Sequence, residues 1–196
     1  DILVNVSNYF NYDLLSHQDK INEIYNVALT GSNKDMDQYV PMNDLLKDLY
    51  DISEKSDFIG DRFVSPFETD WKNHVSSEFG SRTPIILPDG TVTNSNHTGI
   101  DLSNKLGSPI KSIATGKVVI VRHTNIGLGL FVVIDHGAGI FSVYGHMSRI
   151  YVSENDELSA GDVIGEVGSS GYSTGPHLHL EIIEKRKNVN PRIYLK

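Results

Sequence analysis

Cysteine is absent from the 196 residues of the chain. This absence excludes disulfide scaffolds, cysteine nucleophiles and thiolate metal sites, so any metal must be held by imidazole and carboxylate groups. Apolar runs of the roughly 18 residues that a membrane span requires are also absent. The chain has no excess of positive charge, since its formal net charge is −8. This acidic balance disfavours a phosphate backbone as the main partner. We therefore expect neither nucleic-acid binding nor direct membrane insertion by this chain.

Charge divides the chain unevenly. Residues 1–70 carry 14 acidic and 5 basic side chains, whereas residues 71–196 carry 11 acidic and 12 basic ones. Such asymmetry indicates two units with different roles. We predict an acidic helical segment or cap over residues 1–64, followed by a second unit over residues 65–196.

Two stretches of the acidic part have the apolar periodicity of amphipathic helices. Apolar residues recur at spacings of three, four and seven over Leu14–Ala28, and the pattern returns over Leu45–Tyr50. Pro41 and Asn43 are a plausible start and N-cap for the second helix. We interpret these helices as a small packed cap or linker, and a partner-docking module is the alternative.

From about residue 65 onward, short β-branched runs alternate with turns rich in Gly, Asn, Asp and Ser. No helical pattern intervenes, so we predict an α+β chain whose larger unit is predominantly antiparallel β. The predicted strands are Lys117–Arg122, Leu130–Asp135, Ile140–Tyr144, Asp162–Val167 and His177–Ile183.

The last predicted strand carries an H-x-H pattern. Because side chains alternate along a strand, His177 and His179 project from the same face, about 7 Å apart. His97 and Asp101, four residues apart in an extended segment, share a face as well, and Gly99 between them is expected to leave room for an ion. Imidazole nitrogen and carboxylate oxygen together suit Zn²⁺. Either pattern alone is weak evidence for a metal site, but the two together in one β-rich unit favour it.

These patterns, with their surroundings, resemble the lysostaphin/LytM-type zinc endopeptidases over about residues 71–196. The resemblance implies an open-cleft antiparallel β domain. The residues that carry it are His97 with Asp101, Tyr144–Ser148, Gly175–His179, Phe79–Arg82, Pro109–Val118, Gly161–Gly171 and Asn190–Pro191.

The resemblance implies a role for each of five residues. His97, Asp101 and His179 are expected to bind one zinc ion, while His146 and His177 flank the open position and handle the attacking water and the oxyanion. We hypothesise that His177 is the general base, because histidine has a pKa near ~6.5 and no H-E-x-x-H glutamate is present. His146 would then be the oxyanion donor, although the two roles could be exchanged.

Other polar residues receive weaker assignments. Tyr144 and Asn96 are expected to contact substrate at the cleft. Arg82 is expected to form a structural ion pair or a carbonyl contact, not a substrate contact. We interpret the remaining histidines as surface or structural residues: His17, His74, His123 and His136.

The substrate implied by the resemblance is bacterial peptidoglycan, cut within its stem peptides or cross-bridges at glycyl bonds or at bonds involving D-alanine and diamino acids. One alternative is a non-catalytic wall-binding or amidase-activating module, which would require a lost ligand. Another is an enzyme autoinhibited by residues 1–70. A biotinyl or lipoyl carrier domain is discarded, because no lysine occupies a hairpin tip between Ile120 and Pro176.

Localisation follows from the expected substrate. A peptidoglycan hydrolase acts outside the cytoplasmic membrane, so we expect an extracellular or cell-wall location. The sequence begins at Asp1 without a signal-type segment, and an export signal or anchor is expected ahead of it in the natural chain. Residues 1–64 could connect the enzyme to a larger wall-associated, phage or conjugation assembly.

Overall fold

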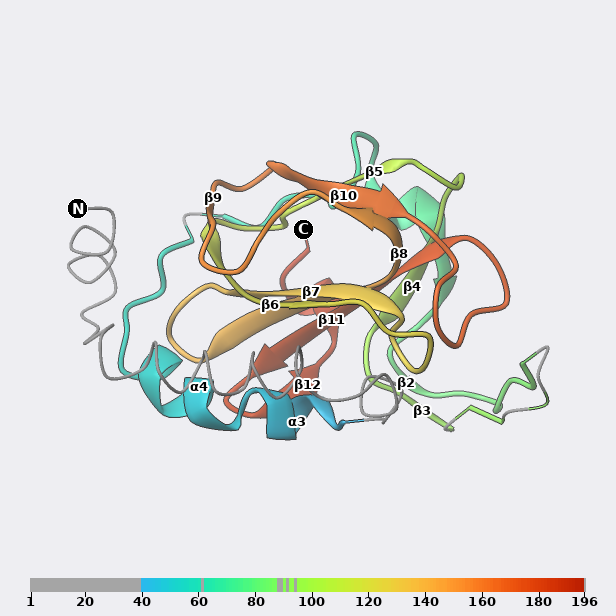
Figure 1. Cartoon of the computed structure of the whole chain (residues 1–196), viewed down its shortest axis with the longest axis horizontal. Coiled ribbons are helices and arrows are strands. Elements are labelled where there is room, and N and C mark those ends of the chain that lie inside the picture. The colour runs from blue at the N-terminus through green and yellow to red at the C-terminus, as the bar shows by residue number, and fades with distance from the viewer. Residues whose placement is uncertain (1–39, 61, 88–89, 91, 94, 196) are drawn as a thin grey trace.

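The fold is known from a computed structural model (Figure 1), which describes residues 40–60, 62–87, 90, 92–93 and 95–195. Its helices are α3 (Met42–Leu45) and α4 (Lys47–Ser53), with two 3₁₀ turns, η1 (Trp71–His74) and η2 (Pro191–Ile193). The strands are β1 (Val75–Ser77), β2 (Gly80–Ser81), β3 (Asn96–His97), β4 (Ile100–Ser103), β5 (Pro109–Lys111), β6 (Gly116–Arg122), β7 (Leu130–Asp135), β8 (Ile140–Ile150), β9 (Glu157–Leu158), β10 (Val163–Val167), β11 (His177–Glu184) and β12 (Lys187–Val189). The helix predicted over Leu14–Ala28 lies outside the described residues.

The predicted antiparallel β architecture is confirmed. The main sheet follows the order β1-β4-β11-β8-β7-β6-β9, β10 pairs with β5 and β8, and β12 pairs with β11. Each of these pairings is antiparallel. The neighbouring strands β4, β11 and β8 near one end of this order carry four of the five predicted site residues.

Both faces of the central strands are buried, which explains their nearly continuous apolar sequences. On β7, Val132 and Ile134 point into one hydrophobic cluster, whereas Phe131 and Val133 point into a second cluster on the opposite face. Helices α3 and α4 cover this second face. Leu46, which lies between the two helices, is fully buried there.

The described part of the N-terminal segment packs against the sheet. The Ser53 hydroxyl donates a hydrogen bond to Asp135 Oδ1 on β7 (2.6 Å). The proposed N-cap is wrong, however: α3 begins directly after Pro41 without a side-chain cap. Asn43 instead accepts a hydrogen bond from the Tyr50 hydroxyl (2.6 Å). The boundary between residues 64 and 65 stays a prediction.

No helix in the described part of the chain is long and apolar enough to cross a membrane.

His136 is part of a buried polar network. Its Nδ1 donates to the Thr115 carbonyl (2.8 Å), and its Nε2 contacts the Ser142 hydroxyl (2.7 Å). The Ser142 hydroxyl is also hydrogen-bonded to the hydroxyl of Tyr144 (3.0 Å). Burial lowers the pKa of His136 to about 4, although the Thr115 carbonyl opposes this shift. His136 is therefore a neutral structural residue, as expected.

This buried histidine predicts a pH-dependent stability. A histidine of the unfolded chain has a pKa near ~6.5, so its depressed folded pKa gives stability that is complete above this value and lost as the pH falls toward about 4. Between pH 6.5 and 5 the loss is about 2 kcal/mol, at about 1.4 kcal/mol per pH unit. We expect His136→Gln to remove about this much of the change in unfolding free energy between pH 6.5 and 5, measured on the metal-free chain in the presence of a chelator. Exposed His123→Gln is the control, and equal slopes for the two variants would contradict the prediction.

Candidate metal centre and active site

The site is assembled by the pairing of β11 with β4. Alternation along β11 sends His177 and His179 to the same face, while Leu178 enters the core on the other face. In the antiparallel register, His179 lies opposite Asp101 of β4, and β3 brings in His97 just before β4 begins. Helices α3 and α4 cover another part of this same face. Ile183 projects from β11 on the same side as His177 and His179, and it packs in the hydrophobic cluster that these helices cover.

Gly99 has a different role from the one predicted. A Cβ atom at this position would lie 2.3 Å from the Leu180 carbonyl oxygen, so the glycine permits β11 to approach the turn between β3 and β4. The expectation that it leaves room for the ion is wrong. Gly99 instead allows the two halves of the site to meet.

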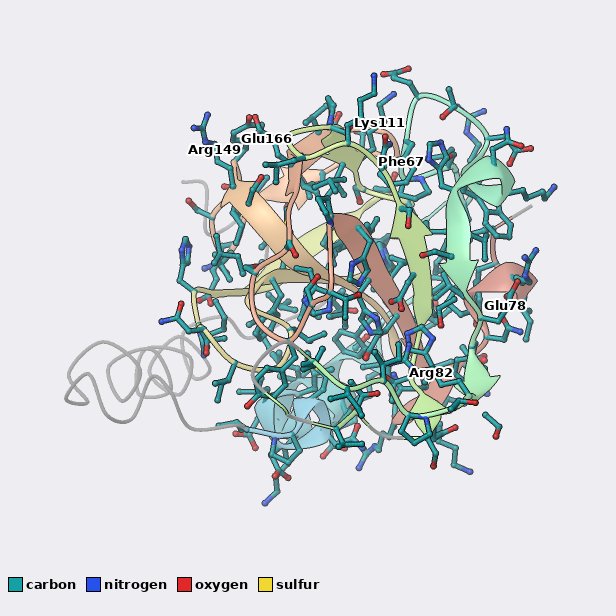
Figure 2. All side chains as sticks on the ribbon, turned by 90° about the vertical axis from the view of Figure 1, so that its right-hand side faces the viewer. Phe67, Glu78, Arg82, Lys111, Arg149 and Glu166 are labelled. Carbon is teal, nitrogen blue, oxygen red and sulfur yellow. The ribbon has the colours of Figure 1, made fainter. Side chains whose placement is uncertain are left out.

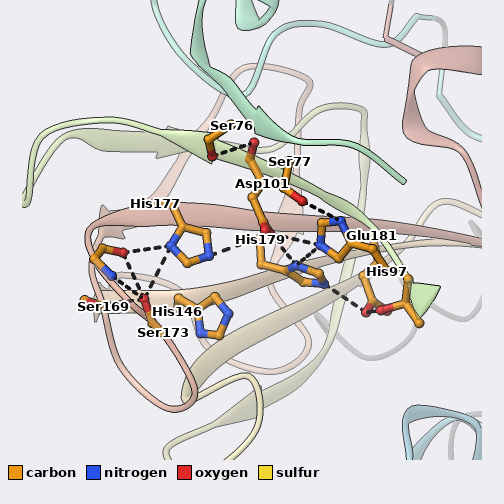
Figure 3. Close-up of polar contacts among 12 residues, drawn as sticks. Ser76, Ser77, His97, Asp101, His146, Ser169, Ser173, His177, His179 and Glu181 are labelled. Atoms are coloured by element: carbon orange, nitrogen blue, oxygen red, sulfur yellow. Dashed lines mark hydrogen bonds and ion pairs between the residues drawn. The ribbon is translucent and has the colours of Figure 1, made fainter. Parts of the chain in front are cut away.

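Three ligand atoms converge within the distances that a metal site requires. His97 Nε2 lies 3.1 Å from Asp101 Oδ1 and 3.2 Å from His179 Nδ1, and His179 Nδ1 lies 2.8 Å from Asp101 Oδ1. Tetrahedral ligands at Zn–N distances near ~2.0 Å stand about 3.3 Å apart. Figure 3 shows the three side chains converging. They form a group able to hold a metal ion.

Hydrogen bonds set the tautomers of both histidine ligands. His97 Nδ1 donates to the Glu78 carbonyl (2.7 Å), which leaves Nε2 free to bind a metal. His179 Nε2 donates to Glu181 Oε1 (3.0 Å), so Nδ1 faces the other ligands. Such outer partners orient ligating imidazoles and raise their basicity. The donor set therefore fits a divalent metal without rearrangement.

The third potential ligand, Asp101, is held as a carboxylate. Burial alone would raise the pKa of Asp101, but its close contacts with the imidazoles of His179 and His97 hold the pKa well below its usual range. Arg82 Nη1 donates to Asp101 Oδ2 (3.2 Å), which leaves Oδ1 for the metal. Arg82 thus makes the structural ion pair predicted for it. Figure 2 shows that it lies on the same side of the molecule as Glu78.

The metal-free site holds a proton where the metal would bind. Burial alone would lower the pKa of His179, but hydrogen bonds to Asp101 and Glu181 raise it to about 9. At neutral pH the imidazole is therefore protonated on both nitrogens. A metal must displace the proton on Nδ1, so its affinity falls as the pH falls.

Glu181 is a site residue that the sequence analysis missed. It is almost fully buried and accepts hydrogen bonds from His179, from the Thr98 hydroxyl and from Asn188 Nδ2 (2.9 Å). Burial alone would raise the pKa of Glu181, but these bonds lower it. The signal was present in the sequence, because Glu181 follows His179 by two residues on the predicted strand and shares its face.

We predict that Glu181→Gln weakens metal binding. The amide still accepts from His179 but carries no charge, and loss of such outer partners typically costs roughly 10–100-fold in metal affinity. Chelator competition with the purified chain would measure the change. Glu184→Gln is the matched control, because it removes the same charge from the same strand but lies on the opposite face. Equal zinc affinities for the two variants would contradict the assignment.

Two further histidines stand beside the three ligands (Figure 3). His177 Nδ1 donates to the Gly175 carbonyl (2.8 Å), and its Nε2 lies 3.6 Å from Asp101 Oδ1. His146 Nδ1 donates to the Ser170 carbonyl (2.8 Å), and its ring centroid lies 4.7 Å from that of His177. Burial lowers the pKa of His177. Burial, and then the neighbouring His179 and His177, lower the pKa of His146 to about 3. Both rings thus have a bare Nε2 at neutral pH.

His146 reaches the site only because β8 is irregular. Gly145 pairs with His179 and Tyr144 pairs with Leu180, so regular alternation would send His146 into the core. A left-handed backbone at His146 (φ 60°) returns its side chain to the metal face. This is an uncommon conformation for a residue other than glycine.

The expected substrate contact by Tyr144 is not supported, because its side chain is fully buried in the core. Its hydroxyl accepts a hydrogen bond from the Ile113 amide (2.9 Å), and burial raises its pKa to about 12. Asn96, by contrast, is exposed on β3 next to His97. Its contact with substrate stays a prediction.

The fold and this site define a metallopeptidase-like class, and comparisons with known proteins identify the family. A model of peptidase family M23 matches residues 95–191. The catalytic domain of the prophage-encoded M23 protein EnpA from Enterococcus faecalis is 36% identical, with a TM-score of 0.56 over 67% of this chain and 97% of that domain. The chain therefore belongs to peptidase family M23, which confirms the lysostaphin/LytM-type resemblance.

Two further relatives are similar. A zinc-containing peptidase from Vibrio cholerae is 30% identical, with a TM-score of 0.55 over 66% of this chain and 39% of that one. The peptidoglycan DD-endopeptidase ShyA of Vibrio cholerae is 35% identical over 64% of this chain and 28% of its own length. The chain spans 34% or less of the length of the curated relatives that it matches.

Proposed function

We propose that the chain is a zinc-dependent endopeptidase that hydrolyses peptide bonds in the stem peptides or cross-bridges of bacterial peptidoglycan. The observation that carries the proposal is the convergence of three ligand atoms beside two histidines with bare Nε2 atoms. The names of the relatives support the substrate, because ShyA is a peptidoglycan DD-endopeptidase. Such a substrate places the enzyme outside the cytoplasmic membrane, at the cell wall.

The metal is proposed to be one zinc ion per chain. Two imidazole nitrogens and one carboxylate oxygen suit zinc, and three protein ligands leave a position open, as in catalytic sites. When bound by His97, Asp101 and His179, zinc would polarise the scissile carbonyl and make water acidic enough to react near neutral pH.

His177 is proposed as the general base. Its Nδ1–H is fixed on the Gly175 carbonyl, so Nε2 is the nitrogen that accepts a proton from the attacking water. The same Nε2 can then deliver this proton to the leaving amine. Its 3.6 Å separation from Asp101 Oδ1 places it at the edge of the metal centre.

His146 receives a revised role. Donation to the oxyanion would require a proton on Nε2, and the pKa of about 3 opposes that charge. The neutral ring, with Nδ1–H fixed on the Ser170 carbonyl, accepts hydrogen bonds through Nε2. We therefore propose that His146 orients the attacking water for His177.

The alternatives receive less support. A non-catalytic wall-binding or amidase-activating module would be expected to lack a ligand, whereas His97, Asp101, His146, His177 and His179 are all present. Autoinhibition by the N-terminal segment and its docking to a larger assembly stay predictions, because residues 1–39 lie outside the described part.

The test is to incubate the zinc-loaded chain with purified peptidoglycan of two cross-bridge types, directly linked and glycine-bridged. The released fragments are then identified by mass. The proposal expects new amino and carboxyl termini within the peptide part, and the fragment masses name the bond. Release of sugar fragments alone, or no release from either wall, would overturn it.

A further inference from the structure

We propose that Ser170 is a positioning residue for His146. The Ser170 hydroxyl links two segments that lie next to His146. These links fix the Ser170 carbonyl, which accepts the hydrogen bond from His146 Nδ1. The inference rests on the proposed function in one respect, since it assumes that His146 acts in hydrolysis.

The contacts of Ser170 reach both segments. Its Oγ accepts a hydrogen bond from the Leu130 amide at the start of β7 (2.9 Å) and donates one to the Met147 carbonyl on β8 (2.7 Å). Its own carbonyl accepts from His146 Nδ1 (2.8 Å). A single residue therefore binds the side chain of His146 and the residue that follows it.

The loop around Ser170 is pressed against the loop that precedes β7. A Cβ atom at Gly129 would lie 2.4 Å from the Ser170 carbonyl carbon, and one at Gly171 would lie 2.4 Å from the Gly129 nitrogen. The Tyr172 amide donates to the Gly127 carbonyl across the same junction (2.8 Å). The Ser170 carbonyl thus has little freedom to rotate while the hydroxyl bonds persist.

His146 needs this support because its backbone is left-handed (φ 60°). A non-glycine residue keeps such a conformation only where its surroundings enforce it. The amide of His146 donates to the Leu128 carbonyl (2.7 Å), and its ring is held by Ser170. Without the Ser170 hydroxyl, the carbonyl can turn away, and the ring loses both its orientation and its tautomer.

The test compares Ser170→Ala with Ser170→Thr, which keeps the hydroxyl. Ser148→Ala is the matched control, because the Ser148 hydroxyl also donates from β8 to a β10 carbonyl (2.9 Å) but contacts no site histidine. On a soluble cross-linked muropeptide, Ser170→Ala should lower kcat by about 10–100-fold, as expected for a misplaced catalytic group. KM and zinc content should stay unchanged. Ser170→Thr and Ser148→Ala should retain most of the wild-type kcat.

A second readout does not depend on activity. Imidazole ¹H–¹⁵N spectra of the zinc-loaded chain should show His146 as a single Nδ1–H tautomer in the wild type and in Ser170→Thr, and as a mixture in Ser170→Ala. Should Ser170→Ala not fold, Ser170→Cys replaces it, because a thiol is a weak hydrogen-bond donor of similar shape.

The outcomes separate the two proposals. A Ser170→Ala variant with wild-type kcat and a single His146 tautomer would overturn the positioning role, whatever its thermal stability. A wild-type chain that cleaves no muropeptide would overturn the proposed function, while the spectra would still decide whether Ser170 holds His146.

Discussion

Replacing His179 by alanine is expected to abolish both zinc binding and peptidoglycan hydrolysis while the chain stays folded. His179 carries one of the three proposed ligand atoms, and its Nδ1 lies 2.8 Å from Asp101 Oδ1 and 3.2 Å from His97 Nε2. The variant also leaves the buried Glu181 carboxylate without its histidine partner. Removing one ligand of three leaves a site too weak to retain zinc through dialysis.

The measurement for this variant is zinc per chain by elemental analysis, alongside fragment release from peptidoglycan. His74→Ala is the control, because His74 binds Thr69 and the Ser103 carbonyl and is not a site residue. Circular dichroism should show that both variants are folded. Retention of one zinc by His179→Ala would contradict the assignment of the metal centre.

Replacing His177 by alanine should separate catalysis from metal binding. His177 is not among the three proposed ligands, so zinc content should stay near that of the wild type. Loss of a general base typically lowers the rate by about 10²–10⁴-fold. Within the described part of the chain, the hydrogen bonds of its side chain run only to Gly175 and Ser173, in the loop that precedes β11, so the fold should survive.

Initial rates at saturating zinc would measure this effect, with exposed His123→Ala as the control. An activity of His177→Ala above about a tenth of the wild type would rule out the base assignment, since general acid–base catalysis contributes at least about 100-fold. In that case the bare Nε2 of His146 would be the next candidate for the base.

Strand periodicity was sufficient to predict the half of the site that lies on β11. His177 and His179 share a face because β11 is a regular strand, and the same rule would have included Glu181 had it been applied two residues further. The pairing partner of β11 could not be derived from periodicity. Spacing suggested His97 and Asp101 as the other half of the site, and the resemblance implied their role as ligands. The register of β11 with β4 explains why they meet His179.

The substrate contact expected of Tyr144 was wrong because the backbone of β8 is locally irregular. Tyr144 and His146 are two residues apart and would share a face on a regular strand, but the left-handed residue at position 146 separates them. Tyr144 therefore lies in the core while His146 faces the metal centre. Gly99 was misinterpreted for a different reason, because the closeness of the Leu180 carbonyl depends on tertiary packing.

The most direct test of the central claim is to titrate the metal-free chain with zinc while following the release of peptide fragments from peptidoglycan. We expect activity to be absent without metal, to rise in proportion to added zinc and to stop rising at one equivalent per chain. Cleavage in the presence of excess chelator, or no cleavage at one equivalent, would contradict the account.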